Sequence, residues 1–186
     1  MKYLVVGLGN IGPEYDLTRH NIGFSVLDHL AHNFNVEFSA NRLASTTQIK
    51  YKGRPITLAK PSVYMNNSGK STLYWLNNLK IKESNYIIVT DDIALPFGKI
   101  RIKPKGGSGG HNGLKDIEQH LGTTKYPRMR FGIGNNFSQG QQSSFVLGKF
   151  SSEEQKQIPQ HIKKASEALL CFCTLGINQA MNQYNI

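Results

Sequence analysis

The chain lacks the long hydrophobic segments on which membrane proteins and secreted precursors depend. None of its apolar runs approaches the roughly 18 to 20 residues that are needed to cross a bilayer. The apolar segment Leu4–Leu8 near the first residue is too short for the core of a signal peptide, and no small-residue cleavage site follows it. We therefore expect no membrane association and a location in the cytoplasm.

Cysteine is scarce, which leaves little basis for a disulfide framework or a cysteine-based metal site. The two cysteines, Cys171 and Cys173, lie two residues apart in a stretch with a helical pattern, so their side chains point in different directions. This spacing disfavours a disulfide or a metal-binding pair. We predict two buried thiols in a reducing compartment.

Acidic residues are also few, and the chain is strongly basic as a result. It has 12 Asp and Glu against 22 Lys and Arg, a formal net charge of +10 at pH 7. Such an excess on a small domain attracts polyanions, among which nucleic acid is the leading candidate. Charge alone does not separate a nucleic-acid partner from a protein that is simply basic.

The remaining pattern is that of a globular protein in which strands and helices alternate. Its 186 residues fit one domain, and no internal repeat, low-complexity tract or linker divides them. Apolar or alternating segments predict strands at Tyr3–Leu8, Leu43–Lys60 (a pair broken at Gly53), Tyr86–Thr90, Gly98–Lys103 and Arg128–Ile133. Helical spacing predicts helices at Ile22–Phe34, Asn66–Leu79, Leu114–Leu121 and from Ser151 to Tyr184, where Pro159 divides two helices or opens the second and Gly176 interrupts the last stretch. We therefore predict an α/β fold over residues 1–186, a single domain with a twisted, mostly parallel or mixed central sheet and helices on both faces.

One glycine-rich segment matches a nucleotide-binding motif. Gly7–Gly12 follows the first predicted strand and fits G-x-G-x-x-G, the fingerprint whose glycines let a backbone approach a pyrophosphate at a helix N-terminus. In this chain Pro13–Asp16 intervenes and the helical pattern begins only at Ile22, while Asp28 lies within that helix and not at the end of a second strand. A dinucleotide-dependent oxidoreductase is therefore the weakest of the alternatives that we keep open.

Polar residues that can do chemistry follow the predicted strands, at the sheet edge where α/β proteins gather ligand sites. They form four clusters, which are Asn10 with Tyr15 and His20; Tyr64, Met65 and Asn66; Asp91 and Asp92; and Gly109–Gly113, which includes His111 and Asn112. The chain has no G-x-S-x-G elbow and its cysteines are badly placed for nucleophiles, so activation of water is the simplest use of a His–Asp pair. His20 would take the proton, and Asp91 would fix the tautomer of the imidazole and favour the imidazolium that forms.

The order and composition of these motifs resemble the bacterial peptidyl-tRNA hydrolase family. The matching segments run in family order from residue 5 to about residue 150, and the helical tail also fits. They are Val6–Tyr15, Thr18–Gly23, Lys60–Pro61, Tyr64–Gly69, Asp91–Asp92, Leu95–Gly98, Gly106–Asp116, Arg128–Gly134 and Phe145–Gly148. The resemblance implies a carboxylic ester hydrolase that cuts the bond between a peptide, or an N-blocked amino acid, and tRNA, so that the tRNA can be reused in translation.

The resemblance also implies a role for each residue of the site. His20 is the implied general base, Asp91 its partner, and Asn10 the residue that distinguishes a blocked α-amine from ordinary aminoacyl-tRNA. Asn66 and Asn112 are implied to hold the peptide backbone and the reacting ester or water. The other residues expected to bind substrate or tRNA are Tyr15, Tyr64, Met65 and His111, together with Lys103, Lys115 and Arg130, which resemble a clamp for tRNA phosphates. No metal and no organic cofactor are expected.

Elementary chemistry agrees with these roles. An ester is activated enough for one general base, which contributes about 10² to 10⁴ in rate, together with amide donors for the oxyanion. Asparagine amides can bond the main chain of a variable peptide without reading its side chains. The expected partner is peptidyl-tRNA, contacted at its acceptor arm and nascent peptide, and we expect a monomer because no long exposed apolar stripe is evident.

An alternative from a different class is a non-catalytic RNA-binding relative of the same fold, similar to organelle splicing cofactors. A binding module has no need for an oriented base. The joint presence of His20, Asp91 and the asparagines at positions 10, 66 and 112 therefore argues against it.

Overall fold

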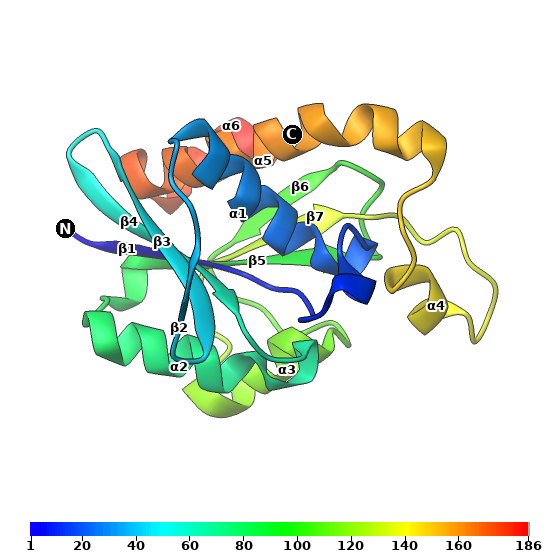
Figure 1. The fold of residues 1–186 in the computed structure, drawn as a ribbon, viewed down its shortest axis with the longest axis horizontal. Helices are drawn as coiled ribbons and strands as arrows, with labels where there is room; N and C mark the ends of the chain where they lie inside the picture. The colour runs from blue at the N-terminus through cyan, green and yellow to red at the C-terminus, as the bar shows by residue number, and fades with distance from the viewer. Residues whose placement is uncertain (186) are drawn as a thin grey trace.

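A seven-stranded mixed sheet forms the centre of the structure, a computed structural model that describes residues 1–185 (Figure 1). The strands lie in the order β2-β3-β4-β1-β5-β7-β6. Their bounds are Tyr3–Gly7 (β1), Ser39–Asn41 (β2), Ala44–Tyr51 (β3), Arg54–Pro61 (β4), Tyr86–Asp92 (β5), Ile100–Lys103 (β6) and Arg128–Gly132 (β7). The central strands β4, β1, β5 and β7 are parallel, and antiparallel pairs join β2 to β3, β3 to β4 and β6 to β7.

Helices cover both faces of this sheet. Their bounds are Ile22–Asn33 (α1), Ser68–Leu79 (α2), Asn112–Leu121 (α3), Gln142–Val146 (α4), Ser152–Leu175 (α5) and Ile177–Tyr184 (α6). Helices α1, α5 and α6 lie on one face, and α2 and α3 lie on the other (Figure 1). Alternate residues of β1 divide between the two cores, because Tyr3 and Val5 pack with α1 and α5 whereas Leu4 and Val6 pack with α2 and α3. The predicted α/β fold with a mixed sheet covered on both faces is confirmed.

The prediction that Pro159 divides two helices, or opens the second, is wrong. Helix α5 runs unbroken through Pro159 for 24 residues. A proline inside a helix leaves the carbonyl four residues earlier without its N–H partner, here that of Gln155. Both Gln155 and Pro159 are exposed, so water can hydrate that carbonyl. Helix α5 begins at a capping box formed by Ser151 and Glu154, and the predicted break at Gly176 is confirmed.

Two short elements have no counterpart in the sequence-based prediction. Strand β2 has three residues, all exposed, and α4 has five residues with none buried. Neither shows the apolar periodicity from which elements are predicted.

The two cysteines, Cys171 and Cys173, are both buried and have free thiols, as predicted. Burial raises the pKa of the Cys173 thiol well above its ordinary value, against the smaller opposing influence of Arg54. Within residues 1–185, no helix has the length and apolar character to cross a membrane.

The topology brings polar residues from three neighbouring strands to one edge of the sheet. Strand β1 lies between β4 and β5, and all three run in the same direction. The segments at their carboxyl ends therefore meet, namely residues 10–20 after β1, residues 64–66 after β4, and Asp91–Asp92 at the end of β5. Open α/β sheets hold ligands at this kind of edge, where neighbouring strands lead to opposite faces.

Two glycines set the distance between α1 and the sheet. Gly23 lies so close to the strands that an added Cβ would be 2.5 Å from the backbone nitrogen of Leu8 and 2.7 Å from the carbonyl oxygen of Val89. Gly7, at the end of β1, meets the carbonyl of Gly23. Because His20 shortly precedes α1, this close contact also fixes how near His20 comes to β5.

We predict that Gly23→Ala destabilises the protein, since backbone atoms of two strands cannot move aside for a methyl group. The expected loss in unfolding free energy, measured by urea denaturation, is about 1–3 kcal/mol, the usual cost of overpacking a core. Gly107→Ala is the matched control, because an added Cβ there has no neighbour within 4 Å. Equal losses in the two variants would show that α1 is not held at its closest approach.

Candidate active site

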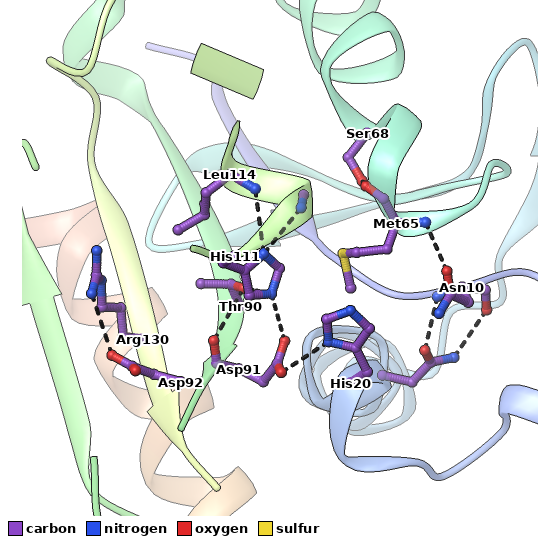
Figure 2. A network of polar contacts seen from close by, with 12 residues as sticks. Asn10, His20, Met65, Ser68, Thr90, Asp91, Asp92, His111, Leu114 and Arg130 are labelled. Carbon is purple, nitrogen blue, oxygen red and sulfur yellow. Dashed lines mark hydrogen bonds and ion pairs between the residues drawn. The ribbon is translucent and has the colours of Figure 1, made fainter. Parts of the chain in front are cut away.

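One aspartate holds two histidines at the centre of the polar cluster (Figure 2). His20 Nδ1 lies 2.9 Å from Asp91 Oδ2, and His111 Nε2 lies 2.7 Å from Asp91 Oδ1. The three residues come from distant parts of the chain. His20 belongs to the short 3-10 helix Arg19–Asn21 before α1, Asp91 to β5, and His111 directly precedes α3.

The hydrogen bonds of His111 define its tautomer. Its Nδ1 accepts from the backbone N–H groups of Gly113 and Leu114, at 3.1 and 3.3 Å, and so caps the N-terminus of α3. A nitrogen that accepts carries no proton, so the proton of the neutral ring is on Nε2. That proton is donated to Asp91 Oδ1, with the hydroxyl oxygen of Thr90 also 2.7 Å from Nε2. His111 is therefore a neutral donor with both ring nitrogens engaged by the protein.

Asp91 is almost fully buried, with 3% of its surface exposed. Burial by itself raises the pKa of this carboxyl, but the electrostatic interactions and hydrogen bonds with His111 and His20 outweigh burial and leave the pKa well below its ordinary value. Asp91 is therefore ionised at neutral pH. With Asp91 accepting, His20 Nδ1 donates, and the lone pair of His20 Nε2 remains for a group in the cleft.

The same three side chains could be considered for a metal site, because one donor atom from each lies within 4.8 Å of the others. Ligation through His111 Nε2 would require that nitrogen to be unprotonated, with the proton moved to Nδ1. Two backbone N–H groups already point at Nδ1, so a proton there would face two other donors. The donor set does not fit a metal ion in this arrangement.

Asn10 is held in one orientation by its neighbours. Its Oδ1 accepts from the backbone N–H of Met65 at 2.7 Å, so its Nδ2 group is directed elsewhere. The Oδ1 of Asn21 accepts from the backbone N–H of Asn10 at 2.8 Å, and the Nδ2 of Asn21 donates to the carbonyl of Asn10 at 3.0 Å. Asn10 thereby joins the loop after β1 to the loop after β4, and it presents an amide donor at the wall of the cleft (Figure 2).

Two hollows lie on either side of His20 and share it as a wall. They also share Asn112 and two residues of α4, Ser143 and Val146. The first hollow, of about 100 Å³, is further lined by Asp91, His111, Arg130 and the loop Ser108–Gly110. The second, of about 210 Å³, is further lined by Asn10, Met65, Asn66 and Leu147. The cleft thus brings together His20, Asp91 and the asparagines at positions 10, 66 and 112.

The two predicted tyrosines form a pair beside this cleft. The rings of Tyr15 and Tyr64 meet edge to face with their centroids 6.3 Å apart, and Tyr64 is 51% exposed. Tyr64 directly precedes Met65, which lines the second hollow. With Tyr64 exposed and Tyr15 half-buried, this pair can pack against a ligand that extends from the cleft.

The three predicted basic residues differ in their surroundings. Arg130 lines the first hollow, where it donates to Gly107 O at 2.7 Å and pairs with Asp92 at 3.4 Å. Lys103, at the end of β6, and Lys115, on α3, are exposed and line neither hollow. Arg130 is therefore partly neutralised within the protein, whereas the two lysines are open to a partner.

Some residues of the site were not anticipated from the sequence. Asn21 holds Asn10, and Thr90 contacts His111; each directly neighbours a predicted residue in the chain, which is a signal that could have indicated it. Helix α4 contributes Ser143 to both hollows, and Ser143 lies outside the matched segment Phe145–Gly148, so no signal in the sequence marked it for this role.

The glycines of the G-x-G-x-x-G segment serve packing in this fold. Gly7 meets the carbonyl of Gly23, and an added Cβ on Gly9 would lie 2.8 Å from the ring of Phe24. Helix α1 starts at Ile22, outside the segment, and only the single 3-10 turn Pro13–Tyr15 follows Gly12, so the segment lacks the α-helix N-terminus that holds a pyrophosphate. This geometry does not favour a dinucleotide-dependent oxidoreductase.

Comparison with known proteins identifies the family of this chain. A model of the peptidyl-tRNA hydrolase family matches residues 4–186. The peptidyl-tRNA hydrolases of Cytophaga hutchinsonii and Bacteroides fragilis are each 52% identical to this chain over 185 residues, which cover 100% of this chain and 98% and 99% of those relatives. The crystal structure of peptidyl-tRNA hydrolase from Acinetobacter baumannii matches with a TM-score of 0.92 at 36% identity, covering 98% of this chain and 94% of that one. The resemblance seen in the motifs is thus confirmed, and the chain belongs to the peptidyl-tRNA hydrolase family.

Proposed function

We propose that this chain hydrolyses the ester that joins a peptide to tRNA, with His20 as the general base acting on water. The observation that carries this proposal is the 2.9 Å contact between His20 Nδ1 and Asp91 Oδ2 in a cleft lined by three asparagines. The contact leaves His20 Nε2 available to a water molecule in a cleft supplied with amide donors. A base, an orienting carboxylate and donors for an oxyanion are the groups that hydrolysis of an ester requires.

Each proton has a defined destination in this mechanism. A water molecule gives a proton to His20 Nε2 while its oxygen attacks the carbonyl carbon of the ester. The tetrahedral intermediate carries a negative oxygen, which an amide N–H such as Asn10 Nδ2 can stabilise. The bond from that carbon to the ribose oxygen then breaks, and the imidazolium of His20 returns the proton to the leaving oxygen. The products are a peptide with a free carboxylate and a tRNA with a free terminal ribose hydroxyl.

Asp91 and His111 act on the base, His20. The ionised carboxylate of Asp91 holds His20 Nδ1 and stabilises the imidazolium that forms during turnover. His111 bonds the second carboxylate oxygen and is itself fixed to the N-terminus of α3, so the carboxylate cannot rotate freely. His111 therefore positions Asp91, and because it also lines the first hollow, the substrate contact expected from the sequence stays a prediction.

The two hollows differ in chemistry, and each suits a different part of the substrate. The second offers the amides of Asn10 and Asn66 beside apolar Met65, which suits the main chain of a peptide of variable sequence. The first offers the glycine loop and Arg130, which suit ribose and phosphate groups. The Asn10 Nδ2 donor can bond the carbonyl of the acyl group that blocks the α-amine of the substrate. A free ammonium group is itself a donor and has no acceptor for Asn10 Nδ2.

The surface supports tRNA as the macromolecular partner. The net charge is +10, and Lys103 and Lys115 are exposed near the cleft-forming loops. Contacts of such lysines with phosphates give salt-sensitive affinity without reading bases, as an enzyme with many tRNA substrates requires. We further propose that residues 1–186 act as a single domain and as a monomer in the cytoplasm, where peptidyl-tRNA arises.

Replacing the base should stop turnover while the fold remains intact. We predict that His20→Gln slows tRNA release from N-acetyl-aminoacyl-tRNA by about 10² to 10⁴, because glutamine cannot take the proton from water. His32→Gln, on the exposed side of the last turn of α1, is the control and should retain the wild-type rate. Release by His20→Gln at nearly the wild-type rate would remove His20 as the base. The wild-type protein should release free-amine aminoacyl-tRNA much more slowly than the blocked substrate.

The lowered pKa of Asp91 predicts an acid dependence of stability. A carboxyl whose pKa is lower in the folded than in the unfolded protein contributes stability that is present above its unfolded pKa and is lost as the pH falls through its folded pKa. We expect the unfolding free energy of the wild type to fall from about pH 5 to about pH 2, and Asp91→Asn to show a shallower fall over that range. Urea denaturation at several pH values measures both slopes. Asp16→Asn, an exposed acid, should keep the wild-type slope; an identical slope in Asp91→Asn would contradict the linkage.

If Lys103 contacts tRNA phosphates, its replacement should weaken binding of whole tRNA substrates but not of a minimal ester that lacks those phosphates. We predict that Lys103→Ala raises KM for whole N-acetyl-aminoacyl-tRNA and reduces the slope of log KM against log salt concentration by about 1, the effect of one lost phosphate contact. Hydrolysis of N-acetyl-aminoacyl-adenosine should be unchanged. Lys50→Ala is the control, because Lys50 is on β3, toward the opposite edge of the sheet from β6. Equal losses on the two substrates would rule out the phosphate contact.

A further inference from the structure

Arg19, the residue before His20, connects the catalytic segment to the α4 wall, by which we mean residues 141–148. The backbone N–H of Arg19 donates to Gly148 O at 2.9 Å, and its Nη1 donates to Phe145 O at 3.2 Å. Its guanidinium also lies over the ring of Phe145, with Cζ 4.2 Å from the ring centroid. Three contacts of different kinds therefore join this one residue to the wall.

The guanidinium is held on its other side by the start of α5. Its Nη2 lies 3.0 Å from Glu154 Oε2, and the same oxygen accepts from Ser151 N in the capping box that begins α5. The Arg19 side chain is only 12% exposed, and its Nε has no hydrogen-bond partner within the described part of the chain. Burying a charged group with an unsatisfied N–H costs stability, so this arrangement is expected where the position of the group matters.

The α4 wall has few other contacts that keep it in place. Helix α4 has five residues, none of them buried, and no side chain caps its N-terminus. A helix this short is not stable by itself. Phe145 and Val146 pack at the margin of the larger core, half-buried. Because Ser143 and Val146 line both hollows, the position of this wall sets the width of the cleft beside His20.

We propose that Arg19 is a positioning residue that holds the α4 wall at a fixed distance from His20, so that substrate meets the wall and the base as one unit. This inference rests on the proposed function of the cleft. Arg19 and His20 are consecutive in one 3-10 helix, so the wall cannot move away from the cleft without breaking the contacts of Arg19. The His20–Asp91 pair does not involve the guanidinium and stays intact when those contacts break. The contacts of Arg19 with the α4 wall therefore act on substrate binding and not on the chemical step.

Steady-state kinetics and hydrogen exchange on the full chain test this proposal together. In Arg19→Lys the charge can still reach Glu154, but an ammonium group cannot also bond Phe145 O and stack on a ring as a planar guanidinium does. We expect KM for N-acetyl-aminoacyl-tRNA to rise about tenfold, kcat to change by less than about threefold, and the pH dependence of kcat to remain that of the wild type. Amide exchange in residues 141–148 should become faster while exchange in α1 stays unchanged.

Two neighbouring glutamates provide a milder variant and its matched control. Glu154→Gln weakens the hold on Arg19, whereas Glu153 meets Lys156 on the surface at 3.7 Å. Only Glu154→Gln should reproduce the higher KM and the faster exchange in residues 141–148, and Glu153→Gln should behave as the wild type.

The results that would overturn the proposal are distinct from a failure of the proposed function. Unchanged KM and exchange in Arg19→Lys would sink it, as would a fall in kcat with an altered pH profile. A lower Tm with an unchanged KM would mark Arg19 as a purely structural residue. Exchange is measured without substrate, so it still tests the contacts of Arg19 with the α4 wall if the wild-type protein fails to cleave N-acetyl-aminoacyl-tRNA, a result that would remove the proposed function.

Discussion

The sharing of one buried carboxylate between two imidazoles is the interaction on which the rest of the site depends. Asp91 is ionised although it is buried, because His20 and His111 each bond one of its oxygens. The two imidazoles have different freedom. His111 has both nitrogens engaged, one of them at the N-terminus of α3, whereas His20 keeps one nitrogen for the cleft. An isolated buried carboxylate would take up a proton to avoid the cost of its charge. The charge that orients the base is therefore a property of the whole trio.

The sheet supplies the precision that this trio requires. Asp91 is part of β5, a strand buried between two parallel neighbours, and His20 is brought against it by the close contact of Gly7 with Gly23. The amide side chains are fixed in a similar way. Asn10 has its backbone bonded on both sides by Asn21 and its oxygen bonded by Met65 N, so its Nδ2 direction is set by strands β1 and β4. Groups that must meet within a few tenths of an ångström are thus carried by rigid elements, as reactive constellations require.

Two kinds of interaction serve the two parts of the substrate, short-range hydrogen bonds for the peptidyl ester and long-range electrostatic attraction for the tRNA phosphates. In the proposed function, short-range amide and imidazole contacts in the cleft act on the ester and the peptide main chain, where orientation decides the rate. The excess of positive charge, in contrast, acts over a longer range on phosphates and needs little exact geometry. Between them stands the α4 wall, a short element held by Arg19 and by the packing of Phe145 and Val146 at the core margin. It is the part of the cleft with the least structure of its own, and so the part most open to adjustment on binding.

The sequence by itself determined the α/β class and the strands β1 and β5, and it indicated five polar residues that the fold gathers in one cleft, His20, Asp91 and the asparagines at positions 10, 66 and 112. Apolar runs and polar motifs are local properties of the chain, so they can be read without the fold. It did not determine that both nitrogens of His111 are hydrogen-bonded, because this depends on backbone N–H groups at the start of α3. It also did not determine that the side chain of Asn21 bonds both the backbone N–H and the carbonyl of Asn10. It did not show that α5 continues through Pro159, and contacts with residues more than a hundred positions away decided where α4 lies. Tautomers, ion-pair partners and the placement of a short polar helix are set by which groups meet in three dimensions. Periodicity in the sequence does not indicate which distant groups come into contact, so only the tertiary structure could decide these features.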